Sequence, residues 1–470
     1  MSKPSLLFVS SEVYPFAKSG GLADVAHALP RALNAEYTLE VCMPLYSFVE
    51  REKYAIQKRI EHFDISMGGV HYPVEIYGCN YEGIEYRFID SALLCEREYM
   101  YGTPEEGYAD NALRFGLFAY AVVALLKEEK QDIVHLNDWQ SALVALLIKE
   151  DTSIKTKSLF TIHNLAYQGI FAHSYLHALD LDTKHFAMDA IEFYHQISFI
   201  KAGIAYADAV TTVSKRYAQE ILTPEFGCGL EGFLKHHKNK LSGIINGIDT
   251  EHFAPAFSDL KGKAQKKKEY LKEVSLRGVK KPLFVFIGRF TWQKGMDLFL
   301  EALESMAAYE CNIAILGQGE SVYTTKLQEL AHVHKNIHLS CTYDESLSLE
   351  MYGAADFLLM PSLFEPCGLN QMIAMHYGAL PLVHHVGGLK DTVQSYKDFD
   401  DTKTKAYGIA FKSPNLTAFL GAFEEALELF ANKREYNKIL KHNMLCDFSW
   451  DKSAKVYSKL YKKITQGEKL

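Results

Sequence analysis

The chain has 470 residues, of which 48% are hydrophobic and 13% aromatic, so it can bury two sizeable cores, and its length favours two large α/β domains. A formal net charge of −8 argues against general binding to nucleic acids. No apolar run reaches the roughly 18 residues of a membrane-spanning helix, which argues against a membrane partner. The eight cysteines lack C-x-x-C pairs and matched histidines, which disfavours disulfides and structural zinc. We expect a reduced, cytoplasmic protein.

The first informative stretch is a strand, a glycine loop and a helix. Residues 6–11 are apolar and predict a buried strand, and apolar positions at 22–33 recur at helical spacing. Between them lies KSGG at 18–21, and an ammonium beside a glycine-rich helix start suits an anion. VGGLKDTV at 386–393 repeats the arrangement. An ordinary glycine turn accounts for either motif alone, but the pair predicts two similar α/β units that bind one anionic ligand.

Strand-like runs alternate with helical patterns along most of the chain. This alternation predicts parallel sheets that helices cover on both faces. In the first half we expect, in order, a strand at 38–46, a hairpin at 70–90 that turns near 80–83, a helix at 111–128, strands at 132–139 and 157–164, a long helical region near 185–206, and strands at 207–214 and 241–249. In the second half we expect strands at 282–290, 311–319, 336–343, 355–362 and 380–385.

The pattern places a domain boundary near 245–250. We therefore expect an N-terminal domain at 1–245, a C-terminal domain at 246–448, and a helical tail at 449–470 that packs back on the first domain. A basic run at 261–281 also contains glutamates and leucines, so we interpret it as a solvated helix face rather than a nucleic-acid patch.

Ligands of parallel sheets bind beyond the carboxyl ends of the strands, which directs attention to polar residues that follow apolar runs. Arg289 and Lys294 follow one such run and could both reach a diphosphate, although a surface pair is the alternative. Glu365 follows another and could accept hydrogen bonds from sugar hydroxyls or cap the next helix. Cys367 has no base near it in sequence, so a packed thiol fits better than a nucleophile.

Two further strand ends carry polar clusters. His163 and Asn164 open the stretch HNLAYQG, where a core histidine is the alternative to a site. Asp138 stands beside Trp139, a combination that suits carbohydrate stacking or, more simply, a helix cap and a buried indole. Two Asp-x-Asp strings, at 180–182 and 398–400, could hold a divalent metal, but they lie in polar loop-like sequence and favour surface acids.

Seven motifs in this order resemble the bacterial glycogen synthases and plant starch synthases over about residues 5–460: KSGGLADV, HNLAYQG, TPEFGCGLEG, NGID, GRFTWQKG, EPCGLNQ and VGGLKDTV. The resemblance implies two Rossmann-like doubly wound domains that face each other across a cleft, the GT-B fold. It also implies transfer of glucose from ADP-glucose to the non-reducing 4-OH of glycogen or another α-1,4-glucan, with retention of configuration. Neither a metal nor another cofactor is implied.

The same resemblance implies site residues by motif. Arg289 and Lys294 would neutralise the leaving diphosphate, Tyr343 would stack on adenine, and His163 would bond the glucose 6-OH. Glu365 would hold glucose hydroxyls. The expected catalytic residues are therefore His163, Arg289, Lys294 and Glu365. The expected donor-binding residues are Lys18, Gly20, Gly21, Asn164, Asn246, Tyr343, Cys367, Gly368, Gly387, Gly388 and Leu389, and the expected acceptor-side residues are Asp138 and Trp139.

The chain departs from the family pattern at two places. Asn137-Asp138-Trp139-Gln140 replaces the common His-Asp-Trp-His, and Asn370 stands where threonine is frequent, which bears on acceptor binding rather than on the reaction. Three alternatives stay open at this point: a related transferase that uses UDP-glucose, a glucan phosphorylase, and an inactive glucan-binding scaffold. No stretch resembles the pyridoxal-phosphate lysine site that a phosphorylase needs.

Overall fold

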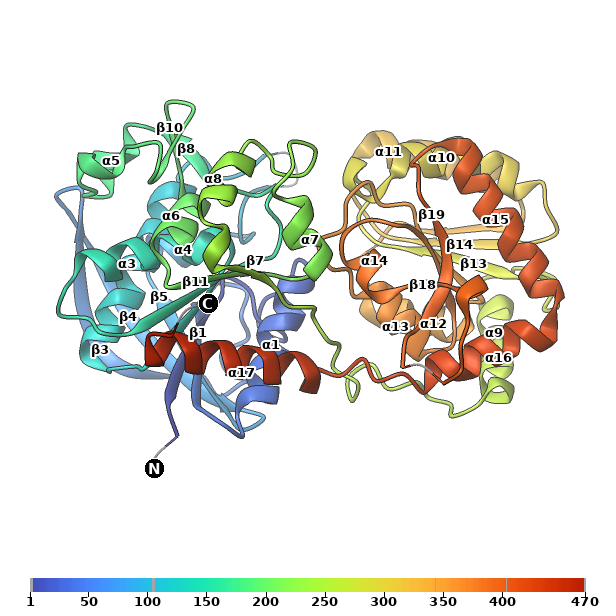
Figure 1. Ribbon diagram of the computed structural model, residues 1–470, viewed down its shortest axis with the longest axis horizontal. Coiled ribbons are helices and arrows are strands. Elements are labelled where there is room, and N and C mark those ends of the chain that lie inside the picture. The colour runs from blue at the N-terminus through green and yellow to red at the C-terminus, as the bar shows by residue number, and fades with distance from the viewer. Residues whose placement is uncertain (1–2, 104–105, 343, 403, 469–470) are drawn as a thin grey trace. The chain divides into compact units, whose positions relative to one another are not determined.

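A computed structural model describes residues 3–103, 106–342, 344–402 and 404–468, with the side chains of residues 60–63 left out. The chain forms two compact units (Figure 1). Unit 1 comprises Met1–Asn246 together with Trp450–Leu470, and unit 2 comprises Gly247–Ser449.

Unit 1 is built on one large sheet, which has nine strands among the described residues. In spatial order they are β12 (Leu241–Gly243), β11 (Ala209–Thr212), β7 (Lys157–Ile162), β6 (Ile133–Asn137), β1 (Ser5–Val9), β2 (Thr38–Pro44), β5 (Ile84–Asp90), β4 (Val70–Tyr81) and β3 (Gln57–Met67). The run from β12 to β5 is parallel, whereas β5, β4 and β3 pair antiparallel. The predicted hairpin at 70–90 is confirmed as β4 and β5, and β3 is a strand that the sequence pattern did not reveal.

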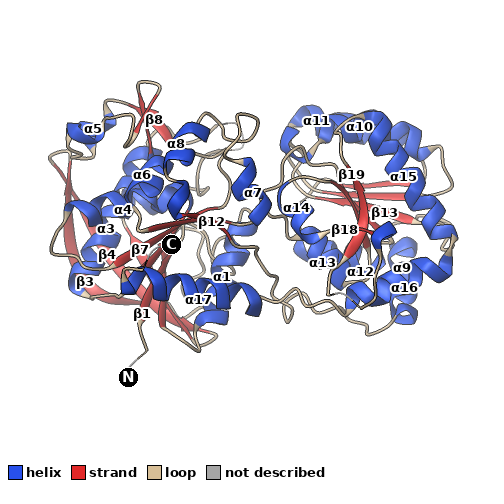
Figure 2. Ribbon diagram, viewed as in Figure 1, coloured by secondary structure: helices blue, strands red, loops and turns tan. Residues whose placement is uncertain are grey.

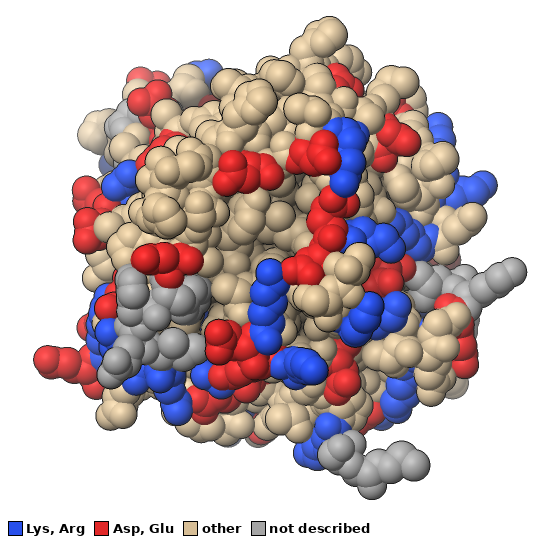
Figure 3. All heavy atoms as spheres, turned by 90° about the vertical axis from the view of Figure 1, so that its left-hand side faces the viewer, with Lys and Arg blue, Asp and Glu red and all other residues tan. Residues whose placement is uncertain are grey.

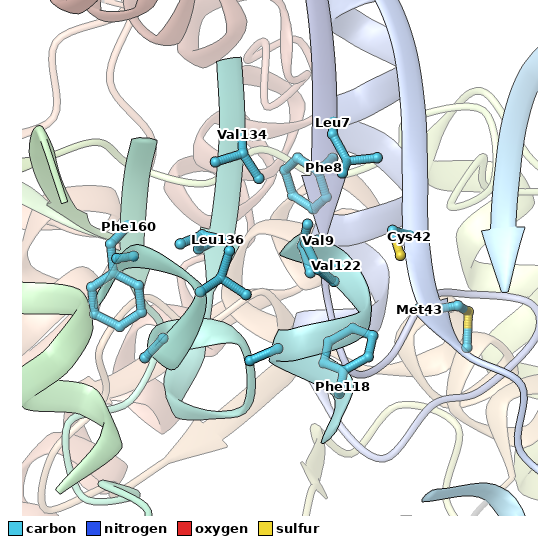
Figure 4. Close-up of a cluster of buried hydrophobic side chains, with 14 of the residues drawn as sticks. Leu7, Phe8, Val9, Cys42, Met43, Phe118, Val122, Val134, Leu136 and Phe160 are labelled. Carbon is cyan, nitrogen blue, oxygen red and sulfur yellow. The ribbon is translucent and has the colours of Figure 1, made fainter. Parts of the chain in front are cut away.

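Helices cover this sheet because its central strands are apolar on both faces (Figure 2). The helices of unit 1 are α1 (Gly21–Leu33), α2 (Ala92–Cys95), α3 (Asn111–Glu128), α4 (Asp138–Glu150), α5 (Tyr175–Ala178), α6 (Phe199–Tyr206), α7 (Lys215–Glu220), α8 (Glu231–His236) and α17 (Asp451–Gln466). Figure 4 shows side chains of β1, β2, β6 and β7 meeting Phe118 and Val122 of α3 in one buried cluster. The helix predicted at 111–128 is therefore confirmed.

The last helix, α17, packs within unit 1 through a row of tyrosine and serine contacts. Its Tyr461 hydroxyl lies 2.7 Å from Nδ1 of the buried His135 on β6, and Ser458 Oγ lies 3.1 Å from the Tyr37 hydroxyl. Both tyrosine rings and the histidine are almost fully buried. These long-range contacts fix the helix to β6 and to the residue that precedes β2.

A small antiparallel sheet interrupts unit 1 between β7 and β11, in the order β8 (Ile170–Ala172), β10 (Gln196–Ser198), β9 (Glu192–Phe193). The long helix predicted near 185–206 is wrong for its first part, since only α6 is helical there. Tyr194 and His195 both adopt positive φ, 48° and 63°, and turn the chain between β9 and β10. Short apolar segments carry a helical spacing by chance, and strand pairing overrides it here.

Unit 2 contains a seven-stranded parallel sheet within the described residues. Its order is β15 (Ile337–Ser340), β14 (Asn312–Leu316), β13 (Leu283–Ile287), β16 (Phe357–Met360), β17 (Leu380–His384), β19 (Tyr407–Phe411), β18 (Gln394–Ser395). Its helices, on both faces, are α9 (Leu260–Glu273), α10 (Met296–Ala307), α11 (Ser321–Val333), α12 (Glu345–Ala354), α13 (Asn370–His376), α14 (Gly387–Thr392), α15 (Leu416–Ala431) and α16 (Lys433–Met444) (Figure 2). Both units are therefore doubly wound α/β folds, as the alternation predicts.

The basic run at 261–281 forms α9, but not all of its lysines are solvated. Lys263 and Lys267 are buried. The Lys267 ammonium pairs with Asp356, and that of Lys263 donates to three backbone carbonyls, including Tyr377 O at 3.0 Å. Burial lowers the pKa of Lys263 to about 7. Two lysines of the run therefore stabilise the fold of unit 2, which the count of charges in the sequence does not reveal.

None of the helices in the described residues is long and apolar enough to cross a bilayer. The face of unit 1 in Figure 3 carries acidic and basic side chains side by side, the mixture typical of a solvated surface.

Candidate active site

In unit 1, the ends of three neighbouring parallel strands gather polar side chains. β1, β6 and β7 lie next to one another, so their carboxyl ends share one edge of the sheet. Residues 10–12 follow β1. Asn137 and Asp138 lie at the end of β6, and His163 and Asn164 follow β7. The structure thus brings Asp138, His163 and Asn164, which the sequence singles out, to one place. Glu12 and Asn137 were not predicted, although both also follow apolar runs.

The loop before α1 is folded around Glu12. Its carboxylate accepts hydrogen bonds from the backbone N–H of Ser19 at 2.6 Å and of Gly20 at 3.2 Å. The Lys18 ammonium lies 2.7 Å from Asp24 Oδ1, on the first turn of α1. Gly20 occupies the N-cap position, and no side chain caps the helix there. The loop therefore presents Lys18 beside a helix start, where the N–H groups of the first turn lack the i−4 acceptors of the helix interior and Ala23 N–H instead donates to Gly20 O at 3.3 Å.

The two predicted glycine motifs differ in what their glycines do. Gly20 has an extended backbone, with φ −163°, and a Cβ placed on it meets nothing within 4 Å. A Cβ on Gly388 would lie 2.2 Å from the carbonyl oxygen of Cys367, and its N–H donates to Glu365 O at 2.9 Å. Gly388 is therefore required by packing, whereas nothing in the fold of unit 1 requires glycine at 20.

This contrast gives a prediction. Gly20→Ala should keep or slightly raise the free energy of unfolding, by about 0.4–1 kcal/mol, because alanine restricts the unfolded chain. If the open space beside Gly20 receives a ligand, the added methyl should lower kcat/KM about tenfold, since overpacking costs about 1–3 kcal/mol. Gly388→Ala should instead lower the thermal midpoint. An active Gly20→Ala enzyme with unchanged kcat/KM would contradict the prediction; calorimetry and initial rates decide.

Asp138 is a buried carboxyl that holds a loop. It begins α4 with a positive φ of 55°, and its Oδ1 accepts the N–H of His163 at 2.7 Å and that of Asn164 at 3.4 Å. Burial raises the pKa of Asp138 to about 7, although the two amide hydrogen bonds act the other way. The side chain therefore fixes the backbone at the end of β7.

The raised pKa of Asp138 predicts a pH effect on stability. The folded state binds the proton more tightly than the unfolded chain, whose Asp pKa is about 3.9, so stability should fall as pH rises from about 4 to about 7 and then level off. Asp138→Asn lacks this titration and should gain thermal stability relative to the wild type over that range. Asp151, a partly exposed residue whose pKa Lys127 lowers to about 2, supplies the control variant Asp151→Asn. The prediction is refuted if the difference in thermal unfolding midpoint between Asp138→Asn and wild type is the same at every pH from about 4 to about 7.

The imidazole of His163 is oriented by Asn137. The Asn137 amide Nδ2 donates to the carbonyls of Val9 at 3.0 Å and His135 at 3.3 Å, so its Oδ1 accepts from His163 Nε2 at 2.9 Å. Burial lowers the pKa of His163 to about 3, which keeps the ring neutral near pH 7. With the proton on Nε2, Nδ1 carries the lone pair and can accept a hydrogen bond.

Two other predicted residues of unit 1 are buried. Trp139 is 8% exposed and packs against the rings of Phe115, Phe171 and Phe199, so its indole is largely inside the core. Asn246, the last residue of the first segment of unit 1, is 6% exposed, and its Oδ1 has no hydrogen-bond partner in the described part of the chain.

In unit 2, residues that follow two of the strands form an ion pair. Lys294, after β13, places its ammonium 2.6 Å from Oε2 of Glu365, after β16. Ser362 Oγ donates to the same oxygen at 3.0 Å, and Glu365 is 5% exposed. Gly295, with φ 72°, has no room for a side chain against Pro361 O, and this close approach holds the two loops together. Ser362 was not predicted from the sequence.

The remaining predicted residues of unit 2 follow strands of the same sheet. Arg289 is exposed just beyond β13. Cys367 is buried, and its carbonyl and that of Gly368 accept from the Gln371 side chain at 3.1 and 2.9 Å. Gly387 begins α14, the N–H of Gly388 is bonded to Glu365, and that of Leu389 donates to Val386 O at 3.1 Å. Tyr343 lies outside the described residues.

The described residues contain no group of three or more histidine, cysteine, aspartate or glutamate side chains placed to hold a metal ion. Asp180 and Asp182, from one Asp-x-Asp string, instead accept backbone N–H groups of Gly68 and Lys184 at 2.7 and 2.9 Å.

Comparison with known proteins matches both units. The family described as starch synthase catalytic domain matches residues 5–236, and glycosyl transferases group 1 matches residues 267–441. A glycogen synthase of Geotalea daltonii is 39% identical over 97% of this chain and 98% of its own. A glycogen synthase of Aquifex aeolicus is 39% identical over 98% of this chain and 99% of its own.

Solved structures agree with these relatives. The catalytic domain of starch synthase IV from Arabidopsis thaliana, bound to ADP and acarbose, superimposes with a TM-score of 0.91 at 30% identity, and covers 99% of this chain and 100% of its own. A sucrose-phosphate synthase from Thermosynechococcus elongatus shares the fold at 16% identity, with a TM-score of 0.66 over 99% of this chain and 100% of its own. The chain therefore belongs to the glycogen and starch synthase family, glucosyltransferases with the GT-B fold.

Proposed function

We propose that this protein transfers glucose from ADP-glucose to the 4-OH at the non-reducing end of an α-1,4-glucan, with retention of the α configuration and release of ADP. Family membership supports this reaction, and the observation that carries it is the ion pair between Lys294 and Glu365 at the strand ends of unit 2. We also assign the nucleotide sugar to unit 2 and the acceptor to unit 1.

The chemistry needs the charges that this pair provides. Cleavage of the anomeric C–O bond leaves negative charge on the diphosphate and an oxocarbenium-like sugar. Lys294 and Arg289 would stabilise the leaving group, because fixed cations need no rearrangement as charge develops. Both polar contacts to the Glu365 carboxylate end on Oε2, and in the described residues no hydrogen bond reaches Oε1. Oε1 would therefore accept a hydroxyl of the transferred glucose.

We assign further substrate contacts to residues of unit 1. His163 would accept a hydrogen bond from the glucose 6-OH through Nδ1, and Asp138 would act by holding the backbone of His163. Asn246 would use its unpartnered Oδ1 for a substrate hydroxyl. Trp139 would support the acceptor side from within the core rather than stack on a sugar.

We propose that the new bond forms on the face from which ADP departs. Retaining glycosidases pair two carboxylates about 5–5.5 Å apart, whereas Glu365 is the only acidic residue in the stretch 357–372 and already binds Lys294. Same-face substitution needs no protein nucleophile. Trapping of a covalent glucosyl-enzyme would contradict this part of the proposal.

The reaction is tested by ADP release from ADP-glucose in the presence of glycogen, with UDP-glucose in a parallel reaction and a control without glycogen. We expect glycogen-dependent ADP release, a preference for ADP-glucose, and full activity after treatment with a chelator. Equal or better use of UDP-glucose would overturn the donor assignment. Loss of activity on chelation would overturn the proposed metal independence, and absence of ADP release would favour a glucan-binding scaffold.

A further inference from the structure

Glu12 is a buried carboxylate that the loop at 17–21 wraps around. It follows β1 and is 5% exposed. Oε2 accepts the backbone N–H of Ser19 at 2.6 Å and of Gly20 at 3.2 Å. Oε1 accepts the Ser19 hydroxyl at 2.7 Å and the hydroxyl of Tyr101 at 2.8 Å. Four donors therefore converge on one side chain.

Every hydrogen-bond partner of Glu12 among the described residues is uncharged. A buried carboxylate without a cation is expensive unless its oxygens are fully hydrogen-bonded, and here both oxygens accept two donors. Such an arrangement orders the groups that donate, because any displacement of the loop leaves a buried charge unsatisfied. The segment ordered in this way contains Lys18 and ends at the first residue of α1.

We propose that Glu12 is a positioning residue that sets the affinity for the nucleotide sugar through the loop at 17–21. This inference rests on the donor of the proposed function, ADP-glucose, and on the contact with that donor that the family resemblance implies for Lys18 and the start of α1. The N–H groups of Ser19 and Gly20 are bonded to Glu12, so they orient the loop and do not serve the diphosphate. Gly20 then contributes by its missing side chain, and Lys18 and the first turn of α1 supply the attraction.

Two tyrosines that contact Ser11 provide a pair of probes. Tyr46 is fully buried and Tyr101 is partly buried, and the hydroxyls of both contact Ser11. Tyr101 also donates to Glu12, whereas Tyr46 donates to the Ser11 carbonyl at 2.9 Å and does not bond to Glu12. Removal of either hydroxyl takes away a hydrogen bond to Ser11, but only removal of the Tyr101 hydroxyl also changes the environment of the carboxylate.

The experiment compares Glu12→Gln, Tyr101→Phe and Tyr46→Phe with wild type in glucosyl transfer and in ADP binding by calorimetry. Glutamine keeps the shape but turns an acceptor into a donor that faces N–H or O–H groups. We expect the KM for ADP-glucose and the Kd for ADP to rise about tenfold or more in Glu12→Gln, the scale of a lost hydrogen bond to a charged group. Tyr101→Phe should show a smaller rise in the same constants, and Tyr46→Phe none. The KM for glycogen should stay unchanged in all three.

The outcomes separate this inference from the proposed function. A wild-type enzyme without glycogen-dependent ADP release refutes the reaction, while ADP binding still tests Glu12. The positioning role is overturned if Glu12→Gln leaves the Kd for ADP unchanged, or if it raises the KM for glycogen as much as the KM for ADP-glucose. If Glu12→Gln does not fold, as judged by thermal unfolding, the two tyrosine variants decide, and equal ADP affinities in both would refute the proposal.

Discussion

Lys294→Ala should lower kcat about a hundredfold while the KM for ADP-glucose rises far less. The Lys294 ammonium is held 2.6 Å from Glu365 and 22% exposed, so its position is fixed before the substrate binds. Such a charge stabilises the leaving diphosphate more than the intact donor, and loss of one preorganised group typically raises the barrier by about 3 kcal/mol. Initial rates at saturating ADP-glucose and glycogen measure the effect.

The same unit offers a matched control. Lys397 forms an ion pair with Glu425 at 2.7 Å, but its side chain is 62% exposed and distant in sequence from both loops. Lys397→Ala should leave kcat unchanged, because exposed ion pairs contribute little. A Lys294→Ala enzyme that loses less than threefold in turnover would defeat the assignment of Lys294 to the leaving group.

Glu365→Gln should lower kcat by a hundredfold or more. The substitution removes the charge that holds Lys294 in place, and it weakens the oxygen proposed to accept a glucose hydroxyl, so two interactions fail together. Ser362→Ala removes only the 3.0 Å hydrogen bond to Oε2 and should cause a much smaller loss.

The double variant sharpens this test. Because Lys294 and Glu365 act as one pair, Lys294→Ala combined with Glu365→Gln should lose little more activity than either single variant. If the increases in activation free energy of the two single variants add fully in the double variant, the two residues act independently. A Glu365→Gln enzyme that retains at least a third of wild-type kcat would remove Glu365 from the site.

The sequence alone was sufficient for features that depend on local pattern. Apolar runs located most of the parallel strands, but not β18 and β19, and helical spacing located α3 at 111–128. The rule that ligands meet strand ends then selected Asp138, His163, Lys294 and Glu365, since these types follow buried strands. Motif resemblance supplied the reaction and the family, which comparison with known proteins bears out.

The tertiary structure alone decided what depends on residues far apart in the chain. The spacing predicts a helical region near 185–206, yet pairing of β9 with β10 makes residues 192–198 a hairpin. From the sequence, Trp139 could stack on a sugar or belong to the core. In the structure, three phenylalanines from other elements pack against it and bury it. No sequence motif marks Glu12, and its role becomes visible only when Tyr101 and the loop at 17–21 hydrogen-bond to it in the folded chain. Spacing along a chain records the period of its local structure, whereas burial and hydrogen bonding are set by partners that only the folded chain brings together.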